Sequence, residues 1–296
     1  MTDRYRFVAA EATHHAIALL CRLLDVSRSG YYGWRGRAEQ ARATADAALV
    51  DRIAAVHAAS RGTYGSPRVH ADLHAAGVTC GRRRVARLMR AAGLRGCRGR
   101  RRILRTTVTD RAAAPAPDRV ERACAPAQVG APDRLWLADI SYVATHEGWL
   151  YLAVALDAFS RRVVGWSMAS HLRAELVTDA LAMALANRQP GAGLIHHSDR
   201  GCQYTSLAVG AALREAGILP SMGSAGDCYD NAVAERFFAT LKVELLHRQP
   251  WPTRAAAQLA IFEFIEVWYN RRRRHSTLGY RSPLEHEEVY RQTAAA

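Results

Sequence analysis

Lysine is almost absent from this chain of 296 residues, although the chain is strongly basic. Lys242 is the single lysine among 41 basic residues, and all the others are arginine. A GC-rich genome explains why lysine is rare, but not why one lysine is kept at this position. The scarcity also excludes a lysine-dependent phosphate-binding loop, since the pattern GK[ST] occurs nowhere.

Long hydrophobic runs are missing as well. No apolar segment approaches the roughly 20 residues that a bilayer-spanning helix requires, and residues 1–20 lack the features of a signal peptide. The net charge of +14 points to a polyanionic partner, either nucleic acid or an anionic membrane. The arginine runs have no bulky apolar face beside them, which disfavours a membrane surface. We therefore expect a cytoplasmic protein that binds nucleic acid and no membrane.

Closely spaced cysteines are a third absence. The six cysteines are widely separated and form no C-x-x-C pair, so we expect free thiols rather than a zinc ribbon or a redox motif. His14, His15 and Cys21 could bind zinc, but no second cysteine lies at ligand spacing, so surface histidines beside a buried cysteine are preferred. The pattern G-x-S-x-G is also missing, which argues against an α/β-hydrolase.

Residues 1–105 are predicted to form a helical, helix-turn-helix-like DNA-binding region. Ile17, Leu20 and Leu24 share one helical face, and Ser27 can cap a second helix that follows a short break. A plain helical hairpin is an alternative for this segment. Further helices are predicted at 46–58, 67–75 and 82–92, the last two joined by a turn at Gly77.

The helix at 82–92 opens a segment of one charge sign. Residues 81–105 contain 11 arginines and no acidic residue. Such a run repels itself and favours a phosphate backbone, although a solvated helix face remains an alternative. The predicted DNA-contact residues here are Arg82, Arg83, Arg84, Arg87 and Arg90.

Residues 106–132 hold four of the ten prolines without sustained periodicity, which predicts a linker or an extended arm. Residues 133–292 are predicted to form an α/β domain with an antiparallel start and a basic helical tail. Strands are expected at 135–143, 149–157, 162–168, 193–197 and 218–222, and helices at 172–188, 206–216, 253–270 and from about 230 past 245. This is the element order of a ribonuclease-H-like fold.

Two aspartates stand at strand positions where burial normally excludes a charge. Asp139 lies within an apolar strand, and Asp199 closes another. An ionised carboxylate in such surroundings is costly unless it is paired or bound to metal. Glu235 lies seven residues before Lys242, so the two share one face of a helix. Asp230 or Asn231 can cap that helix.

If these carboxylates converge, they form an oxygen-ligand site suited to Mg²⁺ or Mn²⁺, and two such ions can promote phosphoryl transfer. The alternative for each acid, taken singly, is a salt bridge or a helix cap. The spacing alone does not decide between them.

Longer strings of residues carry a specific resemblance. Thirty-five residues separate Asp199 from Glu235, and Lys242 follows Glu235 by seven positions. Together with Asp139, this spacing is similar to the D, D-35-E signature of retroviral integrases and related transposases. The strings LWLADISYV, IHHSDRGCQYTS, GDCYDNAVAERFFATLKVE and WYNRRRRHSTLGYRSPLEHE resemble the OrfB-type transposases of insertion sequence three and its relatives. The resemblance extends over essentially the whole chain, including VSRSGYYGW near the N-terminus.

The resemblance implies a ribonuclease-H-like integrase core that cleaves and joins DNA with Mg²⁺ or Mn²⁺, as two ions. It implies that Asp139, Asp199 and Glu235 are the metal-binding catalytic triad and that Lys242 contacts the end of the element. The basic tail is expected to contact DNA phosphates, with a solvated helix end as the alternative. Its residues are Arg271, Arg272, Arg273, Arg274 and His275.

The implied partners are terminal-repeat and target DNA, further copies of the chain, and an upstream-frame OrfA product or an OrfA–OrfB fusion. The chain starts at Met1 in OrfB-like sequence and is expected to be the downstream product of a bacterial element. Two alternatives stay open: a DNA-binding regulator without catalysis, and a nuclease of the same fold without strand transfer.

Overall fold

The computed structural model describes residues 1–97, 116–120, 123–223 and 232–295. The chain divides into two compact units, residues 1–96 and residues 97–296. The proposed division at 105 and the linker to 132 remain predictions, because much of that segment lies outside the described residues. The possible helix caps Asp230 and Asn231 also lie outside them. Among the helices that the structure describes, none is long and apolar enough to cross a membrane.

The first unit begins with a small three-helix core. It is formed by α1 (Thr2–Glu11), α2 (Ile17–Leu23) and the start of α3 (Arg28–Ala59). The predicted cap is present, since the Ser27 hydroxyl accepts a hydrogen bond from the Gly30 amide at 3.0 Å. Gly30 is required where it stands, because a Cβ there would lie 2.3 Å from the Tyr5 hydroxyl oxygen. The buried side chains of this core are Tyr5, Val8, Leu20, Cys21 and Tyr31.

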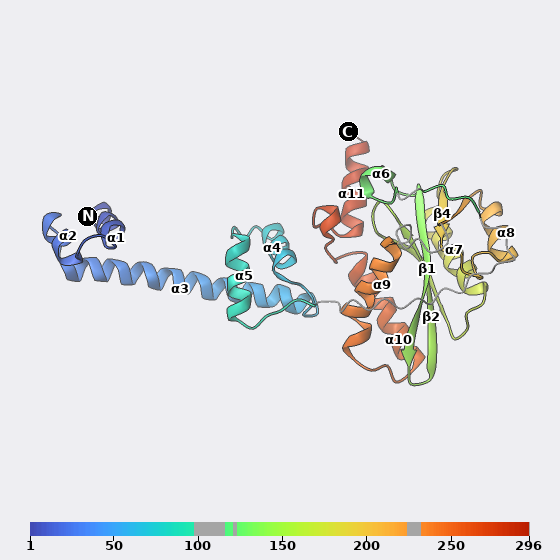
Figure 1. The fold of residues 1–296 in the computed structure, drawn as a ribbon, viewed down its shortest axis with the longest axis horizontal. Coiled ribbons are helices and arrows are strands. Elements are labelled where there is room, and N and C mark those ends of the chain that lie inside the picture. The colour runs from blue at the N-terminus through green and yellow to red at the C-terminus, as the bar shows by residue number, and fades with distance from the viewer. Residues whose placement is uncertain (98–115, 121–122, 224–231, 296) are drawn as a thin grey trace. The chain divides into compact units, whose positions relative to one another are not determined.

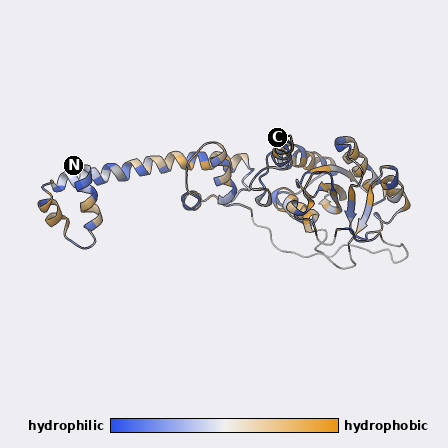
Figure 2. Cartoon of the chain, turned by 90° about the horizontal axis from the view of Figure 1, so that it is seen from above, coloured by the Kyte–Doolittle hydropathy of each residue, from blue (hydrophilic) through white to orange (hydrophobic). Residues whose placement is uncertain are grey.

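Helix α3 corrects one sequence prediction. A short helix after Ser27 and a separate helix over 46–58 were expected, but one helix of 32 residues covers both. The intervening residues 37–45 are mostly alanine, arginine, glutamate and glutamine, which favour helix strongly. Hydrophilic and hydrophobic residues are mixed along this helix (Figure 2).

A second small core lies toward the C-terminal end of α3. Helices α4 (Ser66–Ala75) and α5 (Arg82–Ala91) pack against each other and against α3, close to the predicted limits. Val69 and Val85 are buried there, together with Ile53 of α3. The first unit therefore contains two helical cores on one continuous helix.

The second unit is built on a five-stranded sheet in the order β3-β2-β1-β4-β5 (Figure 1). Strands β1, β2 and β3 are antiparallel neighbours, whereas β4 and β5 run parallel to β1. This confirms the predicted α/β class with an antiparallel start. The strands are β1 (Leu135–Thr145), β2 (Gly148–Asp157), β3 (Val163–Ala169), β4 (Ile195–Ser198) and β5 (Leu219–Met222).

Helices cover this sheet and complete its core. Gly165 of β3 lets α7 approach closely, because a Cβ there would lie 2.2 Å from the Ala180 carbonyl oxygen. The main cluster joins Trp136 of β1 to residues of α7 and α8. The helices of this part are α6 (Pro126–Val129), α7 (Glu175–Arg188), α8 (Leu207–Glu215), α9 (Ala232–Glu244) and the short η1 (Leu246–Arg248).

The C-terminal part departs from the expected single helix at 253–270. Helix α10 (Arg254–Phe262) continues as a wider π-helical segment, η2 (Glu263–Tyr269), and is followed by η3 (Ser276–Leu278) and α11 (Pro283–Ala294). Helix α11 was not predicted. Its N-terminal signal was nevertheless in the sequence, because Ser282 and Glu285 form a capping box around Pro283.

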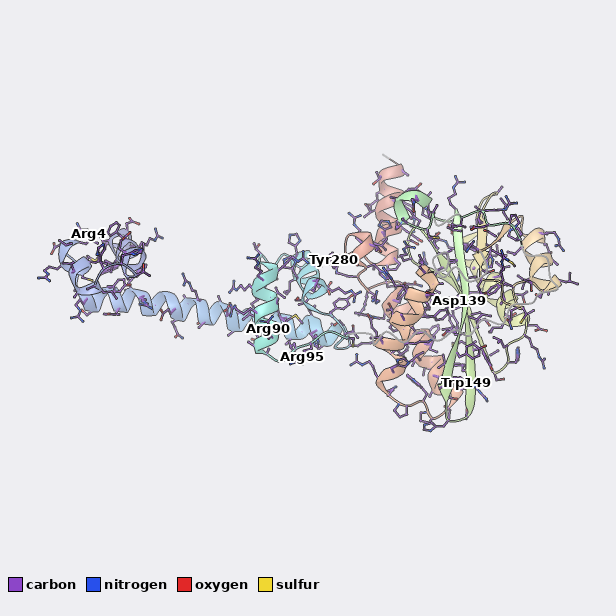
Figure 3. The ribbon with its side chains drawn as sticks, in the orientation of Figure 1. Arg4, Arg90, Arg95, Asp139, Trp149 and Tyr280 are labelled. Atoms are coloured by element: carbon purple, nitrogen blue, oxygen red, sulfur yellow. The ribbon has the colours of Figure 1, made fainter. Side chains whose placement is uncertain are left out.

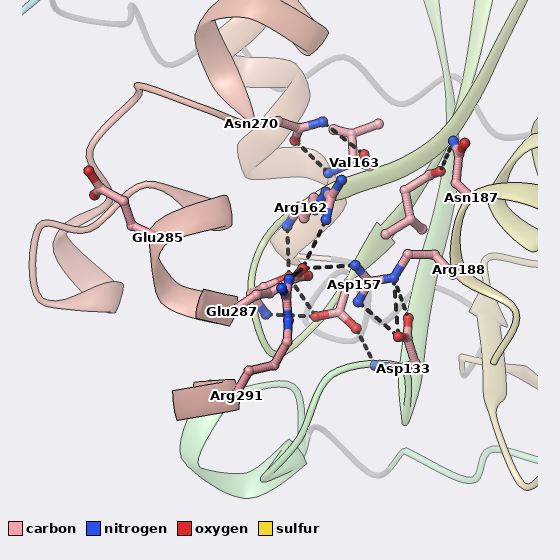
Figure 4. Close-up of polar contacts among 12 residues, drawn as sticks. Asp133, Asp157, Arg162, Val163, Asn187, Arg188, Asn270, Glu285, Glu287 and Arg291 are labelled. Carbon is pink, nitrogen blue, oxygen red and sulfur yellow. Dashed lines mark hydrogen bonds and ion pairs between the residues drawn. The ribbon is translucent and has the colours of Figure 1, made fainter. Parts of the chain in front are cut away.

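Buried charges attach α11 to the sheet domain. The Glu287 carboxylate is 1% exposed and pairs with Arg188 at 2.8 Å and Arg162 at 2.9 Å. Arg188 also pairs with Asp133 at 2.8 Å, and Arg291 lies 3.5 Å from Glu287 (Figure 4). One buried acid thus connects α11 to the end of α7 and to the start of β3.

Candidate active site

Asp139 and Asp199 come from neighbouring parallel strands. The register between β1 and β4 pairs Leu137 with His197. Each aspartate lies two residues beyond its paired residue, so the sheet brings the two to equivalent positions. Adjacent strands are about 4.8 Å apart, and Asp139 lies within the sheet domain on β1 (Figure 3). Asp199 follows the last residue of β4, and its charge acts on Asp139, so the two aspartates are neighbours at this end of β4.

The Asp139 carboxyl shows the electrostatic result of this placement. Burial, and after it the charge of Asp199, raise the pKa of Asp139 to about 8, with a smaller contribution from Glu235. The Ile140 amide donates to Asp139 Oδ1 at 2.8 Å, and this bond and Lys242 act in the opposite direction. Ionisation of Asp139 is therefore unfavourable in this setting, and a nearby added cation would favour it.

Helix α9 supplies Glu235 and Lys242. It packs against β1 through its apolar face, which includes Phe237, Phe238 and Leu241. Partial desolvation raises the pKa of Glu235, although the side chain remains exposed at the surface. Burial lowers the pKa of Lys242, and the charge of Asp139 opposes this change. Asp139 is thus the residue on which the charges of the other three predicted residues, Asp199, Glu235 and Lys242, all act.

A tight turn after β4 fixes the Asp199 side chain. The Gly201 amide donates to Asp199 Oδ1 at 3.0 Å. A Cβ at position 201 would itself lie 3.0 Å from that oxygen, so glycine allows this close approach. The Asp199 carboxylate is therefore oriented by the backbone two residues further along.

The donor set fits a hard divalent cation. Three carboxylates offer only oxygen ligands, and Mg²⁺ and Mn²⁺ prefer these to nitrogen or sulfur. Within the described ranges, no three His, Cys, Asp or Glu side chains are already gathered as a metal-binding group. The chemistry of the site therefore suits the ion, while the ligand cage is not preformed.

The predicted DNA-contact arginines of α5 fall into two groups. Arg82, Arg83 and Arg90 are exposed on the helix, and Figure 3 labels Arg90. Arg87 is exposed as well, but Arg84 and Arg87 pair with Asp46 of α3 at 2.7 Å and 2.6 Å. These ion pairs hold α5 against α3, and they lower the pKa of Asp46 through hydrogen bonds from Arg87 and Arg84.

The basic tail divides in the same way. Arg271 and Arg272 are exposed, whereas Arg273 is 4% exposed and donates to both Glu244 oxygens at 2.9 Å and 2.7 Å. Arg274 donates to the Tyr280 carbonyl at 2.7 Å. Both of these arginines thus make internal contacts, which join the tail to the end of α9 and to the following turn.

The half-buried His275 belongs to this turn. Its backbone amide donates to the Arg281 carbonyl at 3.0 Å, and its ring lies 5.0 Å from the Tyr269 ring. Within the basic tail, the exposed Arg271 and Arg272 are therefore better placed than His275 to contact a DNA phosphate.

Two further polar residues of the sheet domain, Asp157 and Tyr204, are not among the predicted site residues. Asp157 accepts hydrogen bonds from the amides of Asp133 and Ser160, both at 2.7 Å, so it organises the turn after β2. Tyr204 is buried in the main core cluster of the sheet domain. The contact of Asp157 with Ser160 is local to the turn, whereas its contact with Asp133 joins residues distant in the sequence and depends on the fold.

Three family models match the chain. A model of an integrase core domain matches residues 130–228, and a second integrase core domain model matches residues 216–283. A model of an HTH-like domain matches residues 44–102. These matches confirm the predicted integrase-type core and the helix-turn-helix-like region before it.

Curated relatives cover nearly the whole chain. The transposase for insertion sequence element IS629 of Shigella sonnei is 39% identical over 93% of this chain and 93% of its own length. The transposase InsF for insertion sequence IS3A of Escherichia coli (strain K12) is 36% identical over 96% of this chain and 98% of its own. Among solved structures, the catalytic core domain of BIV integrase covers 55% of this chain and 99% of its own, with 21% identity and a TM-score of 0.42.

Proposed function

Because the chain belongs to the family of insertion-sequence transposases with an integrase core domain, we propose that its three-carboxylate site cleaves and joins DNA. The observation that carries the proposal is the environment of Asp139, whose pKa is raised to about 8 by burial and, after it, by the charge of Asp199, with a smaller contribution from Glu235. A binding protein without catalysis has no use for three acids beside a polyanion. The family resemblance inferred from the sequence motifs is confirmed.

The reaction consists of two phosphoryl transfers. In the first, water attacks a phosphodiester at the element end and releases a 3′-hydroxyl. In the second, that hydroxyl attacks a phosphodiester of the target, so one bond is exchanged for another. No covalent bond between protein and DNA forms, and no serine or tyrosine nucleophile is needed.

The carboxylates have one shared role in these steps. Asp139, Asp199 and Glu235 would hold Mg²⁺ or Mn²⁺, as two ions. Once bound, such ions supply activation of the attacking oxygen and stabilisation of the leaving one. The Gly201 amide keeps Asp199 in place, and the pairing of β1 with β4 keeps Asp139 beside it.

The basic residues would bind the DNA. Lys242 would contact the element end, since it lies on the face of α9 that carries Glu235 and is near Asp139. On α5 we assign phosphate contact to Arg82, Arg83 and Arg90, with Arg84 and Arg87 supporting the helix. In the tail, Arg271 and Arg272 remain candidates for phosphate contact.

The partners in this proposal follow from the family. We propose that copies of the chain assemble on terminal-repeat and target DNA in the bacterial cytoplasm. An upstream-frame OrfA product, alone or fused to this chain, would take part. Residues 1–105 would bind DNA, and residues 133–292 would form the catalytic core. Residues 106–132 would connect these two regions.

The test is a cleavage and joining assay on labelled DNA carrying the terminal repeats that flank the reading frame. It compares Mg²⁺, Mn²⁺ and EDTA, with the chain alone and with its upstream-frame partner. Joined products that need metal support the proposal. Cleavage without joining favours the nuclease alternative, and binding without cleavage under every condition favours the regulator.

A further inference from the structure

The two helical cores of the first unit are separated by a bare stretch of α3. The first core packs on α3 at Tyr31, and α4 and α5 pack on it further along, where Leu49 and Ile53 are buried. Between them, every residue of 35–45 whose burial the structure describes is exposed. Figure 1 shows α1 and α2 at one end of α3 and α4 and α5 toward the other. One helix therefore carries two small modules that are held apart.

The first module has the arrangement of a helix-turn-helix. Helix α2 is followed by a turn of four residues, and α3 begins at Arg28 directly after its cap, Ser27. In DNA-binding proteins with this arrangement, the N-terminal residues of the second helix contact base edges in the major groove. The corresponding residues here, Arg28, Ser29 and Tyr32, are all exposed.

This exposed start of α3 has the chemistry of a base-reading surface. Residues 26–38 contain three arginines and no acidic residue. Arginine can donate two hydrogen bonds to the major-groove edge of guanine, and serine can bond to several bases. The Tyr32 side chain is 48% exposed, and its ring packs edge-on against the buried Tyr31 ring with centroids 5.4 Å apart. This packing orients a large side chain with a polar tip beside Arg28 and Ser29.

The continuous helix sets the direction of the second module relative to the first. Arg28 and Asp46 are 18 positions apart on α3, which is five full turns, so both point to the same flank of the helix. Asp46 pairs with Arg84 and Arg87 of α5 at 2.7 Å and 2.6 Å. The basic helix α5 therefore lies on the flank of α3 that carries Arg28.

The same helix sets the distance between the modules. At a rise of 1.5 Å per residue, Arg28 and Asp46 are about 27 Å apart along the axis, and Tyr31 and Ile53 are about 33 Å apart. A DNA duplex presents its major groove on one face once per turn, about every 34–36 Å. Long arginine side chains can cover the difference. The spacing therefore matches one turn of duplex DNA.

We propose that the first unit grips one face of duplex DNA at two places about one helical turn apart. In this grip, Arg28, Ser29 and Tyr32 read base edges, α5 contacts the backbone, and the bare part of α3 fixes the spacing. The inference rests on the proposed function for its ligand, which is the DNA of the element end. It adds a sequence-reading surface near the N-terminus and a rigid spacer to that function.

The first test changes the length of α3 in the full chain. Duplicating residues 38–44 adds seven residues without net charge, lengthens the helix by about 10.5 Å and turns the two flanks by only about 20°. The matched control, Ala41→Gln with Ala43→Gln, keeps the length and the helix-forming composition. Affinity for labelled duplex carrying the flanking terminal repeats is measured by fluorescence anisotropy.

The duplication should weaken binding about 100-fold, because the two modules no longer engage together, whereas the control should bind like the wild type. Circular dichroism and thermal unfolding check that both variants keep their helices. Equal affinity of the duplication and the control would overturn the spacer role.

The second test locates the two contacts by hydroxyl-radical footprinting. Arg28→Ala should weaken protection of one block of the repeat, and Arg83→Ala should weaken another about 10 base pairs away on the same face. Arg28→Ala should also lower affinity for the repeat about tenfold or more, with a smaller loss on a scrambled duplex. Arg6→Ala is the control, since this exposed arginine of α1 pairs with Asp3 at 3.2 Å, and it should change neither.

The outcomes separate this inference from the proposed function. A wild type that joins strands, but whose footprint and affinity respond to neither Arg28→Ala nor the length of α3, would overturn the two-point grip and leave the proposed function standing. A wild type that does not bind the repeats at all would overturn both.

Discussion

Lys242 shows how a single residue can connect composition to chemistry. It is the one lysine in the chain, it is half-buried on α9, and burial lowers its pKa while Asp139 opposes that change. A positive charge at this place partly compensates the carboxylates and can contact a DNA phosphate. Its retention in an arginine-rich chain is consistent with a demand for a compact cation on a flexible stem.

Replacing Lys242 therefore gives a prediction at the residue scale. Lys242→Ala should lower strand joining about tenfold or more, since a lost charge-assisted contact costs roughly 1.5–3 kcal/mol. Lys242→Arg should retain part of the activity because it keeps the charge. Joining of labelled element ends measures both variants, and equal activity of Lys242→Ala and wild type would contradict the assigned contact.

Arg273 gives a second residue-scale prediction, on stability. Its guanidinium and the Glu244 carboxylate form a buried pair, so Arg273→Ala leaves an unpaired buried charge. The free energy of unfolding should fall by about 3–5 kcal/mol. Exposed Arg271→Ala is the control and should change it by less than about 0.5 kcal/mol. Urea unfolding decides the matter, and similar losses in both variants would refute the difference in roles.

At the scale of elements, α11 depends on one buried acid. Burial opposes ionisation of Glu287, but hydrogen bonds and charges from Arg188 and Arg162 hold the pKa of this carboxyl below its ordinary value of 4.5. A lowered pKa in the folded state gives stability that is fully present above the ordinary pKa. That stability is lost as the pH falls through the folded-state value.

Glu287→Gln should therefore destabilise the protein in a pH-dependent way. At pH 7 the loss should be about 3–5 kcal/mol, because the arginines around position 287 lose their buried counter-charge. The gap between variant and wild type should narrow as the pH falls below 4.5 toward the folded-state pKa. Denaturant unfolding across this range is the measurement. A gap that stays constant down to pH 3 would exclude an ionic role.

Helix α5 carries a prediction about DNA. If Arg82, Arg83 and Arg90 each contact a phosphate, replacing one by alanine should reduce the salt dependence of DNA affinity by about one ion. The same change at Arg84 should instead destabilise the first unit, because it breaks the pair with Asp46. Fluorescence anisotropy at several salt concentrations, combined with thermal unfolding, separates the two effects. Unchanged salt dependence in the first three variants would rule out phosphate contact by α5.

At the scale of the whole molecule, the sequence predicted what depends on local pattern. The strands of the sheet and helices α4, α5, α7, α8 and α9 were found near their observed limits, because apolar periodicity and caps are local signals. The continuity of α3 was missed because residues 37–45 carry no apolar stripe, although they favour helix. Partners distant in sequence, such as Arg273 with Glu244, could not be predicted without the fold.

The acidic site combines both kinds of information. The motif spacing indicated Asp139, Asp199, Glu235 and Lys242, whereas their convergence depends on the register of β1 with β4 and on the packing of α9.

The most direct test of the account is strand joining by Asp199→Asn beside the wild type, in Mg²⁺, on labelled DNA carrying the flanking terminal repeats. The substitution keeps the size of the side chain and removes one charge. We predict that joining falls about a thousandfold or more, while DNA affinity measured on the same probe stays near that of the wild type. Normal joining by Asp199→Asn would contradict the assignment of the carboxylates as the catalytic site.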